Sequence, residues 1–188
     1  MNAPEQLKTT RLLLHKPRLA DAEPIFSRYA SDLEVTRFLG WPRHTSIEQT
    51  RAFLAYSELE WERWPAGPYL IEDLNDGRLL GSTGFAFESP QRAMTGYVLA
   101  KDAWGFGFAT EALNAIVRLA EPLQILELFA LCHPDHKASF RVLEKCGFVR
   151  QLERVAGPHF PNLASDSQVD ALCYVRRFRD AQQAQLSS

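Results

Sequence analysis

The stretch DAWGFGFATEAL, residues 102–113, places Gly105 and Gly107 immediately before a helical pattern, and it constrains the fold more than any other segment. The residues before it have strand character, and the apolar residues after it recur at helical spacing. Glycine adopts backbone conformations that other residues avoid, and the first N–H groups of a helix lack partners within the helix. A strand, a glycine turn and a helix start in this order predict a binding site for an anion such as phosphate.

Three other interpretations of these glycines differ in the residue spacing that they require. A dinucleotide-binding motif needs a third glycine where this chain has Thr110, and it opens a βαβ unit, whereas a series of strands precedes this turn. A P-loop needs Gly-Lys-Ser/Thr after four intervening residues, and that pattern is absent. A tight strand-to-helix turn without any ligand stays open as the alternative.

The remaining pattern predicts one α+β domain with a mixed sheet. Residues 45–64 carry the clearest early helix, in which Ser46 and Gln49 fit a capping box. The Asn-Asp-Gly turn at 75–77, between apolar runs, predicts a hairpin, and Gly147 predicts the end of a later helix. Strands are expected at 11–15, 68–74, 78–88, 94–100, 124–132, 148–155 and 169–177, and further helices from Asp21, at 109–121 and at 135–146.

Composition excludes several classes of function. The chain has 188 residues and a formal net charge of −2, so no overall field attracts nucleic acid, and the cluster Arg176, Arg177 and Arg179 is interpreted as a solvated end. The N-terminus lacks a signal-peptide pattern and no apolar run is long enough to span a bilayer, so we expect a cytoplasmic protein without a membrane partner. Three cysteines without CxxC spacing predict neither disulfides nor a metal site.

Two motifs together resemble the GNAT superfamily of acetyl-CoA-dependent N-acetyltransferases, in particular the branch of the ribosomal-protein N-terminal acetyltransferases. The family's diphosphate loop matches Trp104, Gly107 and Ala109, and a second motif matches residues 136–148, HKASFRVLEKCGF. The resemblance covers about residues 9–178, which we take as the core of a single acetyltransferase domain spanning 1–188. It implies a mixed, mostly antiparallel sheet of about seven strands, with a splayed central pair and flanking helices.

By this resemblance, acetyl-CoA is the cosubstrate and no metal is needed. Its diphosphate would lie on the amides of the glycine loop, and its pantetheine arm beside the strand that ends at Val98 and Leu99. The expected CoA-binding residues are Val98, Leu99, Trp104, Gly105, Phe106, Gly107, Phe108, Ala109, Thr110, His136 and Ser139. Main-chain amides near Val98 can polarise the thioester carbonyl.

Three positions depart from the family pattern. Trp104 replaces a polar Gln or Arg, and Phe106 stands where many relatives carry Lys or Arg. These two changes imply that the amides and the helix dipole, rather than side-chain charge, bind the diphosphate. His136 stands where Asn is common, and it can still form one hydrogen bond.

Ser139 is the candidate to hydrogen-bond or protonate the departing CoA sulfur; the alternative is a helix serine that bonds its own backbone. Relatives often carry a Glu as the base shortly before the Gly-Tyr pair of the third strand, but this chain has Met94 and Thr95. The remaining candidates for the base are His159 and Glu88, acting directly or through water. Cys132 and Cys146 have apolar neighbours and are expected to be unreactive, which favours direct attack by the amine.

The resemblance does not name the acceptor amine. A protein N-terminus and a small amine both stay open, and a catalytically inactive acyl-CoA sensor is the alternative outside the enzyme class. Relatives often dimerise, and the sequence leaves a homodimer open. The residues that can line an acceptor pocket or pack in the core are Trp41, His44, Trp61, Trp64 and Phe160.

Overall fold

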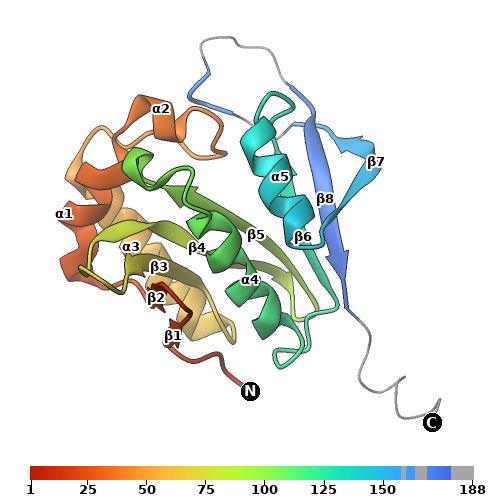
Figure 1. The fold of residues 1–188 in the computed structure, drawn as a ribbon, viewed down its shortest axis with the longest axis horizontal. Helices are drawn as coiled ribbons and strands as arrows, with labels where there is room; N and C mark the ends of the chain where they lie inside the picture. The colour runs from red at the N-terminus through yellow and green to blue at the C-terminus, as the bar shows by residue number, and fades with distance from the viewer. Residues whose placement is uncertain (158–159, 164–168, 179–188) are drawn as a thin grey trace.

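The computed structural model describes residues 1–157, 160–163 and 169–178. In these residues, strands with alternating apolar side chains form one sheet (Figure 1). Its spatial order is β1-β2-β3-β4-β5-β6-β8-β7, antiparallel throughout except for the parallel pair β5 and β6. The strands are β1 (Gln6–Lys8), β2 (Leu12–His15), β3 (Pro68–Asp73), β4 (Leu79–Ser89), β5 (Arg92–Leu99), β6 (Glu127–Cys132), β7 (Val149–Val155) and β8 (Ala171–Arg177).

The expected mixed, mostly antiparallel sheet is confirmed, with eight strands rather than about seven. The additional strand β1 has only three residues, which is too short for a periodic signal, and it exists because its backbone pairs with β2. Short turns of 3-10 helix, η1 (Leu19–Asp21) and η3 (Lys101–Ala103), lie between the elements.

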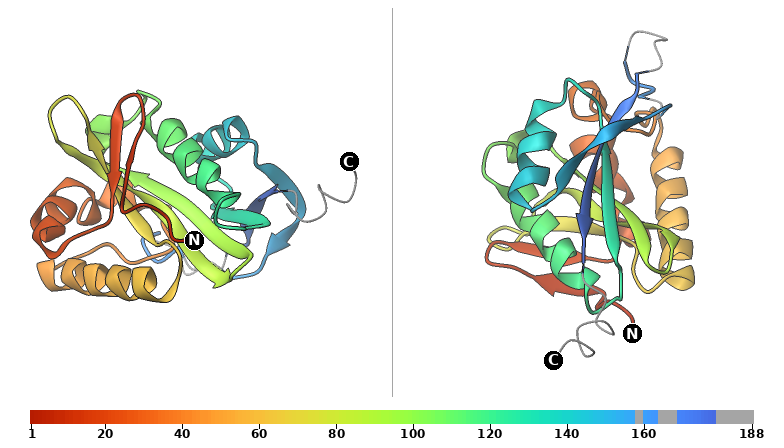
Figure 2. Two further views of the ribbon diagram at one scale, coloured as in Figure 1. Left: turned by 90° about the horizontal axis from the view of Figure 1, so that it is seen from below. Right: turned by 90° about the vertical axis from the view of Figure 1, so that its right-hand side faces the viewer.

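Helices cover both faces of the sheet, with α4 and α5 on one face and α1 and α3 on the other (Figure 2). Their bounds are α1 (Ala22–Ile25), which continues as the π-helical turn η2 (Phe26–Ala30), α2 (Leu33–Thr36), α3 (Ile47–Arg63), α4 (Phe108–Ala120) and α5 (Lys137–Lys145). Strand β3 shows how the two layers arise. Tyr69 and Ile71 pack in the cluster that contains α4, whereas Leu70 between them packs in the cluster that contains α1 and α3.

The local signals for turns and helix ends are confirmed with one correction. Gly77 and Gly147 both have a left-handed backbone, with φ of 69° and 78°, as the hairpin and the helix end require. At the start of α3, the Gln49 side chain accepts a hydrogen bond from the Thr45 N–H at 2.6 Å rather than from Ser46. The N-cap is Ser46 as expected, but its side chain makes no capping hydrogen bond, so the predicted capping box does not form.

Membrane-spanning helices and metal-binding clusters are both absent from residues 1–157, 160–163 and 169–178. Within these ranges no helix combines the length and the apolar character needed to cross a membrane. No group of three or more His, Cys, Asp or Glu side chains in the same ranges is placed to hold a metal ion.

Candidate functional site

The sheet splits between its two central strands. β5 and β6 pair only from Arg92 to Met94, opposite Glu127 to Phe129. Beyond this point β5 continues beside β4 as far as Leu99, and β6 continues beside β8 as far as Cys132, so the two strands diverge between α4 and α5 (Figure 1). The expected splayed central pair is confirmed, and it leaves one edge of β5 open for a ligand.

Two cavities open at this split, and some residues line both of them. The first, with a volume of about 620 Å³, lies against the glycine loop and is called the loop cavity. The second, of about 470 Å³, lies among aromatic side chains and is called the aromatic cavity. Six residues line both: Phe38, Leu39, Tyr97, Val98, His136 and Ser139. The two cavities therefore adjoin each other at these six residues.

The glycine loop has the conformation that an anion site requires. Gly105 and Gly107 both have positive φ, 84° and 80°, which L-residues with a Cβ adopt only with strain. The first amide of the helix to bond within it is that of Glu111, which donates to the Gly107 carbonyl at 3.1 Å. The amides of Phe108, Ala109 and Thr110 come before that bond, and all three residues line the loop cavity.

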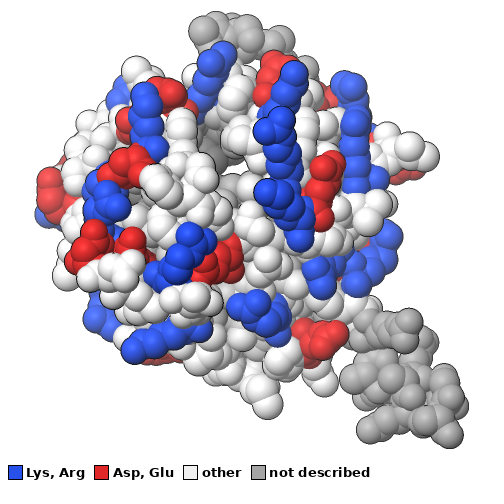
Figure 3. All heavy atoms as spheres, viewed as in Figure 1, with Lys and Arg blue, Asp and Glu red and all other residues white. Residues whose placement is uncertain are grey.

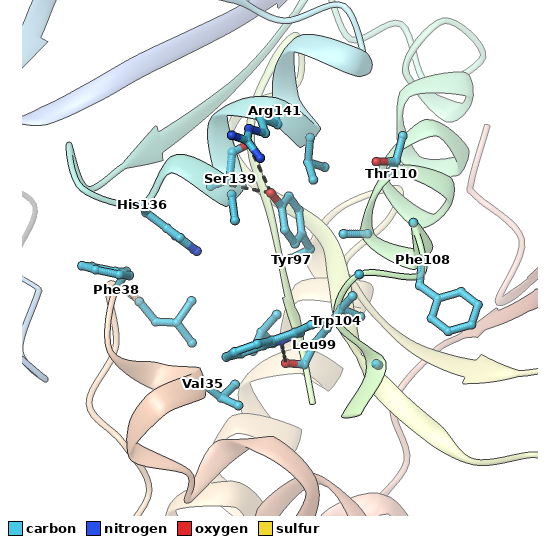
Figure 4. A pocket seen from close by; sticks show the side chains of 18 of the residues that line it. Val35, Phe38, Tyr97, Leu99, Trp104, Phe108, Thr110, His136, Ser139 and Arg141 are labelled. Carbon is cyan, nitrogen blue, oxygen red and sulfur yellow. Dashed lines mark hydrogen bonds between the residues drawn. The ribbon is translucent and has the colours of Figure 1, made fainter. Parts of the chain in front are cut away.

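The structure brings most of the predicted CoA-binding residues to the loop cavity. Val98, Leu99, Trp104, Gly105, Gly107, Phe108, Ala109, Thr110, His136 and Ser139 all line it. Phe106 does not: it is 63% exposed, and its ring packs beside that of Phe108, 5.9 Å between centroids. The ring of Phe108 itself points away from the cavity (Figure 4).

Trp104 contacts the end of β5 with its polar edge. The indole N–H donates to the Leu99 carbonyl at 2.8 Å (Figure 4). Trp104 therefore lies across the end of the exposed edge of β5. Its indole N–H pairs with the Leu99 carbonyl, which has no partner from β6 because that strand has diverged.

Basic side chains line the loop cavity, although the loop carries none. Arg141 and Lys145 on α5 and Arg37 after α2 all border it, with Glu34 nearby. Figure 3 shows Lys and Arg along the hollow of this face. The inference that amides alone must bind the diphosphate is therefore incomplete, because α5 supplies positive charge. The spacing of Arg141 and Lys145, four residues apart, is the signal that could have shown this from the sequence.

Ser139 lies in a polar cluster at the junction of the two cavities. The Tyr97 hydroxyl donates to Ser139 Oγ at 3.2 Å (Figure 4), and Cys132 Sγ lies 3.3 Å from the same oxygen. Burial raises the pKa of Tyr97 far above its usual range, so this phenol stays protonated at neutral pH. Burial also raises the pKa of the Cys132 thiol to about 11. The sequence did not single out Tyr97, because its contact with Ser139 spans 42 residues.

His136 precedes α5 and points into the space between the cavities (Figure 4). Its ring stacks on Phe38, with 4.9 Å between the ring centroids and 26° between their planes. Burial lowers the pKa of His136 below 6.5, and the nearby His133 lowers it further. The imidazole is therefore neutral at pH 7 and able to accept a proton.

The aromatic cavity has apolar walls. Trp41 and Phe160 border it, as do Phe38, Phe85 and Met94, and none of its described lining residues is an Asp or Glu. Asn162 links the loops that carry Trp41 and Phe160, because its amide donates to the carbonyls of Thr36 and Trp41 at 2.8 and 2.9 Å. The other aromatic candidates lie elsewhere. Trp61 packs on Tyr69, Trp64 stacks on Phe87, and His44 lies 2.9 Å from the Thr50 hydroxyl.

The described structure does not bring the sequence candidate Glu88 into either cavity. Glu88 lies at the end of β4, is half exposed and forms an ion pair with Arg92. It lines neither cavity. His159 lies outside the described residues.

A glycine loop at a helix start beside a split sheet defines an acetyltransferase-like fold, and the comparisons with known proteins identify the family. The family model "Acetyltransferase (GNAT) domain" matches residues 11–149. The chain is 34% identical over 153 residues to the "Uncharacterized N-acetyltransferase YoaA" of Bacillus subtilis, which covers 77% of this chain and 83% of that protein. This chain belongs to the GNAT acetyltransferase family.

Solved structures share the fold. RimL, a ribosomal L7/L12 α-N-protein acetyltransferase in complex with coenzyme A, has a TM-score of 0.80 at 23% identity, covering 93% of this chain and 98% of that one. The microcin C7 self-immunity acetyltransferase MccE, in complex with acetyl-CoA and AMP, has a TM-score of 0.80 at 20% identity, covering 94% and 98%. The expected likeness to ribosomal-protein acetyltransferases is thus confirmed at the level of the fold.

Proposed function

We propose that this protein transfers the acetyl group of acetyl-CoA directly to a primary amine. The observation that supports this most is the pair of cavities that meet at the split between β5 and β6. One cavity has the anion-binding loop, the other has apolar walls, and Val98 and Ser139 line both. A thioester held at this junction would face an amine in the aromatic cavity.

Acetyl-CoA would occupy the loop cavity. Its diphosphate fits the amides of Phe108, Ala109 and Thr110, at the positive end of α4. Its pantetheine arm fits the open edge of β5, where the β6 strand has diverged. RimL and MccE were solved with coenzyme A and with acetyl-CoA, which supports the assignment of this ligand.

Acetyl transfer then needs a group that stabilises negative charge on the thioester oxygen and a group that donates a hydrogen bond to the departing sulfur. A main-chain amide near Val98 would stabilise the negative charge that develops on the thioester oxygen. Ser139 would donate a hydrogen bond to the departing thiolate sulfur, and Tyr97 would donate a hydrogen bond to Ser139 Oγ. A covalent route through Cys132 is disfavoured, because a thiol with a pKa of about 11 is almost fully protonated at pH 7.

His136 would accept the proton of the attacking amine. It borders both cavities and is neutral at pH 7, whereas Glu88 is paired with Arg92 outside them. The sequence candidate His159 lies outside the described residues and is carried as the alternative base. The apolar walls suit an amine with a neutral, apolar body, which is compatible with a peptide N-terminus or a small molecule.

The test is the release of free CoA thiol from acetyl-CoA across a panel of α-amino peptides, amino-acid amides, polyamines and aromatic amines. Turnover with at least one amine, together with its acetylated product, would support an enzyme. A protein that binds acetyl-CoA by calorimetry but releases no thiol with any member would support the sensor instead. Absence of binding at millimolar acetyl-CoA would exclude both.

Removal of the basic side chains of α5 should weaken CoA binding. In an Arg141→Ala, Lys145→Ala double variant, we expect the Kd of CoA to rise about thirtyfold at low salt, because each of the two lost charges contributes about 1 kcal/mol beside a phosphate in water. Calorimetry at two salt concentrations measures this, and the difference should shrink as salt rises. Lys137→Ala is the matched control, because Lys137 lies on the same helix but does not line the cavity. An equal effect of Lys137→Ala would contradict a local role.

A further inference from the structure

The N-terminal hairpin contacts the glycine loop across about a hundred residues of sequence. The turn between β1 and β2 carries Thr9 and Arg11, and both bond to Glu111 in the first turn of α4. Glu111 Oε1 accepts from the Thr9 hydroxyl at 2.6 Å and from the Arg11 N–H at 2.8 Å. Its Oε2 accepts from Arg11 Nε at 2.7 Å. Both carboxylate oxygens are therefore held by the hairpin.

Arg11 also contacts the glycine loop itself. Its Nη1 donates to the Phe106 carbonyl at 2.9 Å, and its guanidinium lies 4.6 Å from the centre of the Phe108 ring. The Phe106–Gly107 peptide bond is trans, so its carbonyl and its N–H point in opposite directions. A carbonyl held toward Arg11 therefore directs the Gly107 amide to the other side, toward the loop cavity that Gly107 lines.

Charge balance gives Arg11 a second effect. Burial alone would raise the pKa of Glu111, but the hydrogen bonds from Thr9 and Arg11 outweigh it, so this pKa lies below its ordinary value. Glu111 is thus a carboxylate at the positive end of α4, where a bound diphosphate would also lie. The Arg11 guanidinium neutralises that carboxylate and so removes a repulsion that would act on the ligand.

We propose that Arg11, with Thr9 and Glu111, forms a clamp that holds the glycine loop in its diphosphate-binding conformation. Arg11 is a positioning residue in this account: it lies behind the loop and acts through the Gly107 amide and through Glu111. The inference rests on the proposed function, because it assumes that CoA binds in the loop cavity.

The test compares Arg11→Lys with the same substitution at Arg118, an exposed residue in the last turn of α4. Lysine keeps the positive charge but has no planar fork to bond Glu111 and the Phe106 carbonyl together. By calorimetry we expect Arg11→Lys to raise the Kd of CoA about tenfold, and that of dephospho-CoA by the same factor, since both contain the diphosphate. Arg118→Lys should leave both values unchanged.

A second variant and a second measurement keep the test decisive. Thr9→Val removes one hydrogen bond to Glu111 at nearly constant volume and should raise the Kd of CoA about threefold. In amide NMR spectra, the Gly105 and Gly107 signals should shift on addition of CoA to the parent protein and shift less in Arg11→Lys. A folded Arg11→Lys protein that binds both ligands with parental Kd would overturn the clamp. A parental protein that binds neither would instead overturn the proposed function, and the clamp with it.

Discussion

Replacement of Ser139 by alanine should lower kcat about 100-fold, which is the low end of what a positioned proton donor contributes. Ser139 borders both cavities, and its hydroxyl oxygen accepts a hydrogen bond from Tyr97. Without it, the CoA sulfur would leave as an unassisted thiolate. The Kd of acetyl-CoA should change less than about threefold, because the ligand's phosphates bind elsewhere in the loop cavity. Steady-state kinetics with the best acceptor of the panel and calorimetry measure the two quantities.

Two further variants separate this role from a general loss of packing. Ser57→Ala also removes a buried hydroxyl, but Ser57 lies on α3 and borders neither cavity, so kcat should be unchanged. Tyr97→Phe leaves Ser139 in place and removes the hydrogen bond that supports it, so its effect should be smaller than that of Ser139→Ala. Parental kcat in Ser139→Ala would show that the sulfur departs without this hydroxyl.

The parts of the fold that were predictable have local causes. The hairpin at residues 75–77, the helix end at Gly147 and the helix α4 all follow from residues that lie next to one another in the sequence. Strand β1 and helix α2 were not predicted, because they have three and four residues. Elements of that length depend on backbone pairing and on tertiary contacts rather than on a periodic pattern.

The candidate site divides in the same way. The glycine loop is one continuous segment, so its conformation could be inferred from Gly105 and Gly107. The contact of Tyr97 with Ser139, and the position of Phe38 beside His136, join residues 42 and about a hundred positions apart. No local pattern predicts such neighbours. The candidate base Glu88 forms an ion pair with Arg92, four residues further on across the turn between β4 and β5.

His136 should control the pH dependence of catalysis, and His136→Asn should lower kcat/KM about 100-fold at pH 7. Asparagine is the residue that the family commonly has here, so hydrogen bonding is kept while proton transfer is lost. The ring of His136 stacks on Phe38, which itself also stacks on His133. The titratable side chains that line the two cavities with it include Glu34, Arg37, Tyr97, Cys132 and Arg141. His133 lowers the pKa of His136, with an effect smaller than that of burial.

The lowered pKa of His136 determines how kcat/KM should depend on pH. In the parental enzyme, kcat/KM should fall only below pH 6.5, where His136 becomes protonated and can no longer accept a proton. In His136→Asn the amine must lose its proton to water, so the fall should begin near the amine's own pKa, about 8 for an α-amine. The ratio of the two enzymes should therefore be large at pH 7 and shrink toward pH 9.

The matched control is His44→Asn. Burial also lowers the pKa of His44, but its ring lies beside Thr50 and borders neither cavity. Its pH profile should follow that of the parental enzyme. If His136→Asn reduces kcat/KM by one constant factor at every pH, then His136 positions the cosubstrate rather than moving a proton, and the base must be sought outside the residues that border the junction of the cavities.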